Sequence, residues 1–268
     1  MKISIFQVDA FTEKLFGGNP AAVCILDEWP DDGLLQSIAA ENNLAETAFI
    51  VKNNNGYDIR WFTPLVEVYL CGHGTLASAH VIFNYSDCYE EELIFNSTRS
   101  GQLKVKKDGD LLTLDFPSDD IEMIDTPAGL ARGLGIQPQE TYRGKTDYMA
   151  VLSTQEEVMN LEPHFKLLAA LPCRGIIVTA KGETVDFVSR FFAPQCGINE
   201  DPVTGSAHTT LAPYWARTLG KNKLTAMQVS TRAGHLQCKY LGERTEISGH
   251  AVTYMSGEIE VDVACLVN

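Results

Sequence analysis

The chain has 268 residues, of which 45% are hydrophobic and 21% charged, and its net charge is −14. This composition is typical of a soluble globular protein, and the acidic balance argues against nucleic acid or anionic membranes as partners. The seven scattered cysteines argue against a zinc ribbon and a secreted disulfide framework. No stretch reads as a signal peptide or a membrane span, so we expect a cytoplasmic enzyme.

Short strands alternate with helices along the chain. Strands are predicted at 3–11, 21–26, 46–51 and 57–62, and helices at 34–43 and from about Gly74 to Phe83. A hairpin follows at 102–117, with Asp108-Gly109 at its tip. The stretch from about 117 to 139 contains turn residues and a short helix at 127–135, and it is the predicted crossing between two domains.

An internal repeat is the most informative feature of the sequence. "RWFTP" at 60–64 and "RFFAP" at 190–194 lie 130 positions apart, and each is followed by a glycine-containing turn and a small-residue helix. The strands "AFIV" at 48–51 and "GIIV" at 175–178 precede the two copies in the same order. This conserved order indicates two similar halves.

The two turns of this repeat, "CGHGT" at 71–75 and "EDPVTGS" at 200–206, are candidate anion sites. Helix N-termini present unpaired N–H groups and partial positive charge, so a pair of them could hold a carboxylate without any arginine. Asp201 reads as an N-cap, with Pro202 at the first helical position. The alternative is that the small residues only pack each helix closely against a sheet. The candidate substrate-binding residues are Gly72, Gly74, Thr75, Thr204 and Gly205.

Two further residues are candidates for moving protons. His73 stands between two glycines, where it could position or protonate a substrate oxygen or merely cap local backbone. Glu46 stands where a polar loop gives way to an apolar strand, and a glutamate there is often only solvated. Cys71 and His73 have no further ligand at useful spacing, so no metal site is expected. Ser206 lacks the G-x-S-x-G elbow of a hydrolase nucleophile, and no dinucleotide fingerprint is present.

Five stretches in this order, together with the late "ISGHAV" and "SGEI", resemble the phenazine biosynthesis PhzF-like family over nearly the whole chain. They are "QVDAFT", "GNPAAVC", "AETAFIV", "RWFTPLVEVYLCGHGTLASAH" and "EDPVTGSAHTTLAPYW". The resemblance implies an α+β fold like that of diaminopimelate epimerase. Two pseudo-symmetric domains, each a β-barrel-like sheet around a central helix, would have the active site in the cleft between them. We assign the domains to 1–117, completed by the C-terminal strand, and 118–268.

The resemblance also implies cofactor-free acid/base catalysis and a homodimer. It carries a proton-transferring role to Glu46 and catalytic roles to His73, Asp201 and Ser206. Diaminopimelate epimerase uses one cysteine from each half, whereas Cys71 and Cys196 precede the matching positions here, so a two-thiol racemase is disfavoured. The sequence thus predicts an isomerase that acts on a small anionic, carboxylate-bearing metabolite without cofactor or metal. The alternatives are a cysteine-dependent amino-acid racemase or epimerase and a non-catalytic metabolite-binding protein.

Overall fold

A computed structural model describes residues 1–261, and these residues form two compact units. Unit 1 comprises Met1–Asp115 together with the chain from Ser248 onward, and unit 2 comprises Phe116–Ile247. The chain therefore leaves unit 1 within β8 (Leu111–Pro117) and returns to it within β17 (Arg244–Gly249).

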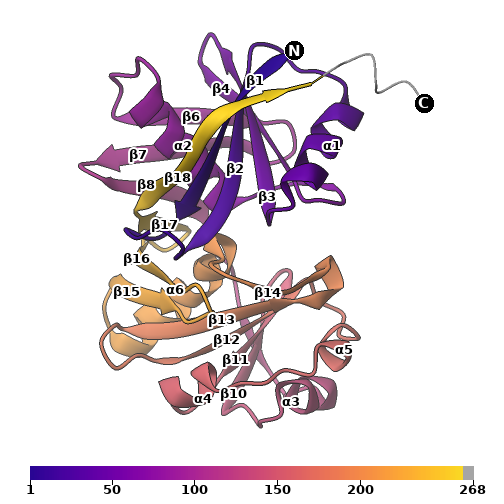
Figure 1. Cartoon of the computed structure of the whole chain (residues 1–268). Helices are drawn as coiled ribbons and strands as arrows, with labels where there is room; N and C mark the ends of the chain where they lie inside the picture. Colours follow the sequence, from indigo (N-terminus) through magenta and orange to yellow (C-terminus); the bar gives the residue numbers. More distant parts are fainter. Residues whose placement is uncertain (262–268) are drawn as a thin grey trace. The chain divides into compact units, whose positions relative to one another are not determined.

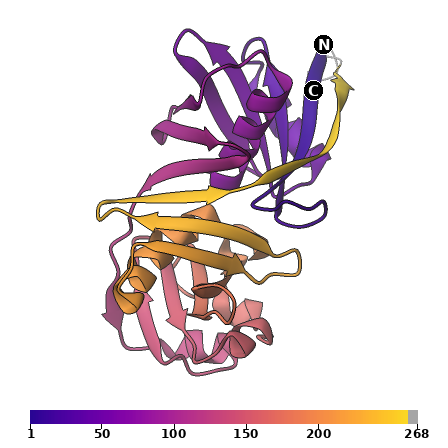
Figure 2. The same ribbon diagram turned by 90° about the vertical axis from the view of Figure 1, so that its left-hand side faces the viewer.

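Unit 1 is built mainly of strands (Figure 1). Its last strand, β18 (Ala251–Glu260), pairs antiparallel with β1 at the other end of the chain (Figure 2). Before β8, its elements are β1 (Lys2–Ala10), β2 (Asn19–Leu26), α1 (Asp32–Asn42), β3 (Glu46–Asn53), β4 (Gly56–Phe62), β5 (Glu67–Val68), α2 (Gly72–Tyr85), β6 (Glu92–Ser97) and β7 (Gly101–Asp108).

Unit 2 has the same kinds of element in a similar order. Between β8 and β17 these are β9 (Glu122–Ile124), α3 (Ala128–Leu134), β10 (Glu140–Arg143), β11 (Asp147–Val151), α4 (Gln155–Met159), α5 (Phe165–Leu168), β12 (Gly175–Lys181), β13 (Phe187–Ala193), a 3₁₀ turn (Pro194–Cys196), β14 (Ile198–Asp201), α6 (Gly205–Leu219), β15 (Lys223–Gln228) and β16 (Gly234–Tyr240).

The strand pairing repeats between the units. In unit 1, β2 pairs parallel with β3, β3 antiparallel with β4, and β4 parallel with β6. In unit 2, β11 pairs parallel with β12, β12 antiparallel with β13, and β13 parallel with β15. The main helix of each unit follows the third strand of this series, as α2 follows β4 and α6 follows β13. The internal repeat of the sequence is thus a repeat of topology.

The central helices explain why the sequence around them is rich in small and apolar residues. Leu76, Ala77 and Ala79 of α2 are fully buried, and the helix packs on β1, β2, β3 and β18. Leu211 and Ala212 of α6 are also fully buried, and that helix packs on β15 and β16. A helix that is buried on most sides has little need of a polar face, because the surrounding sheet supplies its contacts.

The predicted second domain, 118–268, differs from unit 2 at its C-terminal end. Residues from Ser248 onward belong with unit 1, because β18 pairs with β1. Residues 262–268 of that predicted domain lie outside the described residues. None of the helices in the described part of the chain is long and apolar enough to cross a membrane.

Candidate active site

The start of α2 presents the predicted Gly-His turn. Cys71 is the N-cap, and its sulfur accepts a hydrogen bond from the Gly74 N–H at 3.2 Å. Thr75 is fully buried, and its hydroxyl donates to the Cys71 carbonyl oxygen at 2.6 Å. The expectation that Thr75 offers its hydroxyl to a substrate is therefore not supported, because that donor closes the first turn of the helix.

His73 is held between Glu46 and Asn19. Its Nε2 lies 3.0 Å from Oε2 of Glu46, the first residue of β3. Its Nδ1 lies 3.1 Å from the side-chain nitrogen of Asn19, the first residue of β2. An amide can turn either its nitrogen or its oxygen toward the ring. Asn19 can therefore form a hydrogen bond with both the neutral and the protonated imidazole, so the ring can keep its position when it gains or loses a proton.

The electrostatics of this cluster favour a charged imidazole. Burial by itself would lower the pKa of His73, but the interactions of the ring with Cys71 and Glu46 outweigh burial and hold that pKa well above its ordinary value. Burial also raises the pKa of Cys71, so this group is a neutral thiol at neutral pH. The carboxylate of Glu46 is thus the counter-ion of His73 that matters near neutral pH.

The Glu46 carboxylate is largely buried and faces the His73 ring. Its side chain is 14% exposed, and its buried Oε2 atom lies at ion-pair distance from His73 Nε2. Burying a carboxylate is costly unless it is paired, and buried ionisable groups of this kind are concentrated at functional sites. The alternative of a solvated, idle glutamate does not fit this geometry.

The prediction for Asp201 as a helix cap is wrong. α6 begins at Gly205, and Asp201 is the last residue of β14, so Pro202 is not in the helix. The Asp201 carboxylate instead accepts the Thr204 hydroxyl at 2.5 Å, and the Thr204 N–H donates to the Gln228 side chain at 2.9 Å. The Thr204 hydroxyl is therefore not free to donate to a substrate, because it already donates a hydrogen bond to the Asp201 carboxylate.

Ser206, the second residue of α6, is held by an arginine that the sequence did not predict. Arg174 NH1 and NH2 each donate to Ser206 Oγ at 3.1 Å. Its Nε donates to Asp147 Oδ1 at 2.9 Å, and NH2 makes a second, short bond to Asp147 Oδ2. This corrects the expectation that positive potential at the site comes from backbone alone. Neither Arg174 nor Asp147 belongs to a motif of the sequence. The only signal was the position of Arg174 directly before the predicted strand at 175–178, and Asp147 proves to be the first residue of β11.

The two cysteines of the racemase alternative differ in environment. Cys71 is 5% exposed and caps α2, whereas Cys196 is exposed and its thiol lies 3.7 Å from the Arg174 carbonyl oxygen. Glu46, Cys71 and His73 offer donor atoms that lie within 4.8 Å of one another, so the sequence-based argument that no third ligand is near was wrong. The sulfur lies 3.6 and 3.8 Å from the two ring nitrogens. The absence of a metal at this cluster stays a prediction.

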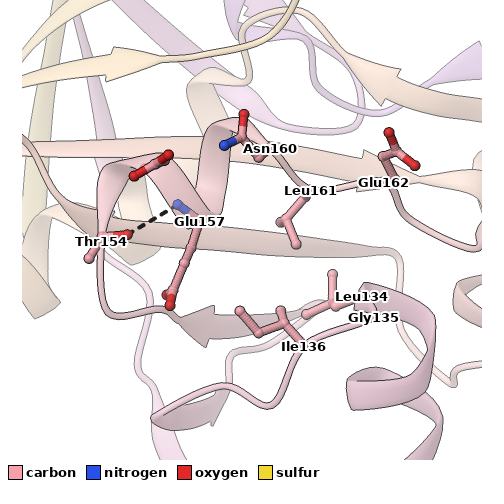
Figure 3. Close-up of a pocket in the computed structure, with 9 residues that line it drawn as sticks. Leu134, Gly135, Ile136, Thr154, Glu157, Asn160, Leu161 and Glu162 are labelled. Carbon is pink, nitrogen blue, oxygen red and sulfur yellow. Dashed lines mark hydrogen bonds between the residues drawn. The ribbon is translucent and has the colours of Figure 1, made fainter.

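A separate groove of about 540 Å³ lies in unit 2 (Figure 3). Its walls carry Glu156, Glu157 and Glu162 above apolar side chains. The Thr154 hydroxyl accepts the Glu157 N–H at 3.1 Å, and the Glu157 carboxylate accepts the Ser153 N–H at 2.8 Å. These bonds cap the start of α4, in a variant of the capping box in which the glutamate binds the N–H of the residue before the N-cap, so the polar groups closest to the helix have a structural role.

Comparison with known proteins places this geometry in context. The model of the family described as phenazine biosynthesis-like protein matches residues 8–257. A Pseudomonas aeruginosa protein named as an isomerase is 52% identical over 97% of this chain and 100% of its own length. The crystal structure of a PhzF family protein from Enterococcus faecalis has a TM-score of 0.95 at 46% identity, and the match covers 97% of this chain and 100% of that one. A hydroxyproline epimerase from Agrobacterium vitis has a TM-score of 0.63 at 11% identity over 96% of this chain and 91% of its own, which shows a shared fold alone.

Proposed function

Because this chain belongs to the phenazine biosynthesis-like protein family and is an isomerase, we propose that it catalyses a cofactor-independent proton transfer on a small carboxylate-bearing metabolite, with Glu46 as general acid/base. The observation that carries the proposal is the buried pair of Glu46 and His73, whose Oε2 and Nε2 atoms lie 3.0 Å apart while the Glu46 side chain remains 14% exposed. A carboxylate that is held in one orientation and is still partly accessible can accept a proton from carbon.

The reaction is a proton shift that leaves the substrate's composition unchanged. The Glu46 carboxylate takes a proton from a carbon next to an acidifying group, and the electron pair of that C–H bond delocalises into this group. The protonated Glu46 then returns the proton to a second carbon on the same face, which regenerates the carboxylate. His73, as the charged neighbour of Glu46, holds the side chain in one orientation and stabilises the carboxylate before the proton is taken and after it is returned.

Solvent-deuterium exchange into a panel of carboxylate metabolites, measured by mass spectrometry, tests this proposal. The panel contains dihydro-hydroxyanthranilate and several amino acids. We expect exchange with the wild-type protein, a loss of about 100-fold or more in Glu46→Gln, and no change in Glu41→Gln. Glu41 is an exposed glutamate on α1, so it controls for the change of charge.

The same assay separates the alternatives. Exchange that persists in Glu46→Gln but stops after thiol alkylation would move the chemistry to Cys71 or Cys196. Burial and a raised pKa make Cys71 a poor nucleophile or base, so we do not expect this result. Binding of a panel member without exchange in the wild type would indicate a metabolite-binding protein.

Other expectations also remain proposals. We propose that Asp201 and Ser206 contribute to the same reaction from unit 2, that the protein is a homodimer, and that it works in the cytoplasm without a metal. Light scattering at several protein concentrations tests the dimer, and exchange activity that survives dialysis against a chelator tests the absence of a metal requirement.

A further inference from the structure

Each unit has a connected group of polar side chains at the starts of two paired strands and of its main helix. In unit 1 they are the first residue of β2, the first residue of β3 and the second residue of α2, occupied by Asn19, Glu46 and His73. In unit 2 they are the first residue of β11, the residue before β12 and the second residue of α6. These are Asp147, Arg174 and Ser206. The repeated topology thus places a second polar group at the starts of the matching strands and helix of unit 2.

The contacts of Arg174 leave one donor unused. A guanidinium has five N–H groups, one on Nε and two on each terminal nitrogen. Nε and NH2 bind Asp147, while NH1 and NH2 bind Ser206 Oγ, which accounts for four of them. The fifth, on NH1, has no hydrogen-bond partner in the described part of the chain. The Arg174 side chain is 38% exposed, so a ligand can reach it.

Ser206 has a matching free donor. Its oxygen accepts two N–H groups from Arg174 at 3.1 Å, and its hydroxyl hydrogen has no acceptor among the described residues. The hydroxyl must therefore direct its hydrogen away from the guanidinium. NH1 and Oγ therefore each keep one donor for a ligand, and a carboxylate can accept a hydrogen bond from either of them.

The group is built to hold this geometry. Asp147 is 3% exposed and binds the guanidinium through both of its oxygens. The Phe191 ring lies against the guanidinium, 5.3 Å from centroid to Cζ. A guanidinium that is fixed in orientation before binding loses little freedom when the ligand arrives.

We infer that Arg174 and Ser206 form a carboxylate-binding site in unit 2, with Asp147 as the positioning residue that orients Arg174. The ligand class is a carboxylate monoanion, which the charge of Arg174 attracts and for which the NH1 N–H and the Ser206 O–H are the available donors. The inference rests on the proposed function only for identifying this ligand with the carboxylate of the isomerase substrate.

Binding of 4-fluorobenzoate, followed by ¹⁹F NMR, tests the site without turnover. We expect wild-type protein to bind 4-fluorobenzoate and to bind the neutral 4-fluorobenzamide more weakly. Arg174→Met should weaken 4-fluorobenzoate binding about tenfold or more, and Ser206→Ala by a smaller factor. Arg132→Met is the matched control, because Arg132 is an exposed arginine of α3 in the same unit and its loss changes the net charge equally.

Arg174→Met leaves the buried Asp147 carboxylate without its partner and could unfold unit 2. The double variant Asp147→Asn, Arg174→Met removes that buried charge and should also lose binding while it keeps the wild-type circular dichroism spectrum. Wild-type affinity in the folded double variant, or no 4-fluorobenzoate binding by the wild type, would overturn the inference. Glu46→Gln should bind 4-fluorobenzoate as the wild type does. The binding experiment therefore tests the carboxylate site separately from catalysis by Glu46.

Discussion

In unit 1 the residue that opens β3 is a glutamate, and in unit 2 the residue that precedes β12 is an arginine. Each charged side chain reaches the second residue of the helix that follows, Glu46 toward His73 and Arg174 toward Ser206. The backbone frame is the same, but unit 1 carries a pair that can exchange a proton and unit 2 a cation that cannot lose one. The two halves thus share one strand and helix topology but differ in the charged groups it carries, which is the difference that the proposed proton transfer in unit 1 and the inferred anion binding in unit 2 depend on.

In each half, one arginine at the same position of the repeat holds the backbone around the main helix. Arg60 of β4 binds both carboxylate oxygens of Glu67 at 2.8 and 2.9 Å, and Arg190 of β13 binds those of Glu200 at 2.7 and 2.9 Å. All four side chains are at most 20% exposed. The repeated R-x-F-x-P motif therefore has a structural role. Its arginine joins β4 or β13 to the segment that connects this strand to α2 or α6.

The largest effect should come from removing this arginine in unit 2. Arg190 also donates to backbone carbonyl oxygens at the end of α4 and just after it, among them Leu161 at 2.9 Å, whereas the other partner of Arg60 is the exposed Asp32. We expect Arg190→Met to lower the free energy of unfolding by about 3–5 kcal/mol, because it leaves a partly buried carboxylate unpaired. Arg60→Met should cost less, about 2 kcal/mol.

Urea unfolding followed by fluorescence and circular dichroism measures both variants, with Arg132→Met as the surface control. The two units could unfold in separate steps, so each transition is fitted by itself. Equal losses for Arg60→Met and Arg190→Met would show that the extra carbonyl contacts of Arg190 contribute nothing to stability.

The second prediction contrasts a histidine from each helix. His208 of α6 is fully buried and donates from Nδ1 to the Thr204 carbonyl oxygen, and burial lowers its pKa to about 4. A neutral histidine with a lowered pKa stabilises the fold above pH 6.5 and loses this contribution as the pH falls toward 4. The shift corresponds to about 3 kcal/mol. The pKa of His73 is raised, so its contribution is complete below pH 6.5 and is lost as the pH rises through the raised value.

NMR titration of the imidazole signals tests this contrast, with assignments from His208→Leu and His73→Gln. We expect His73 to be protonated at neutral pH and His208 to stay neutral down to about pH 4. If both rings titrate near their ordinary value of 6.5, neither the Glu46 pairing nor the burial of His208 has the effect argued above.

The sequence predicted the repeat and singled out Glu46 and His73 as candidates because both leave local signals, but it did not predict that these two side chains form a pair. Arg60 and Arg190 stand in nearly identical pentapeptides, and Glu46 and His73 belong to stretches that resemble a known family. It did not predict the Arg174 group, because Asp147, Arg174 and Ser206 are brought together only by the pairing of β11 with β12 and the position of α6. Asp201 was misread for a related reason. Asp-Pro is a strong helix-start signal, but β14 extends through Asp201 and delays the helix to Gly205.

The smallest effect concerns the glycine that follows the reactive histidine. A Cβ at Gly74 would lie 2.9 Å from the Cys71 sulfur and 3.0 Å from Cδ1 of Trp61, so the glycine serves close packing at the N-cap of α2. Gly74→Ala should therefore lower the free energy of unfolding by about 1 kcal/mol, since the strain outweighs the higher helix propensity of alanine. The double variant Cys71→Ala, Gly74→Ala removes the sulfur that the new methyl group meets. Its cost should be smaller than the sum of the two single costs, and a double-mutant cycle in urea measures the difference. Additive costs would mean that the contact with Trp61, not the sulfur cap, requires glycine at this position.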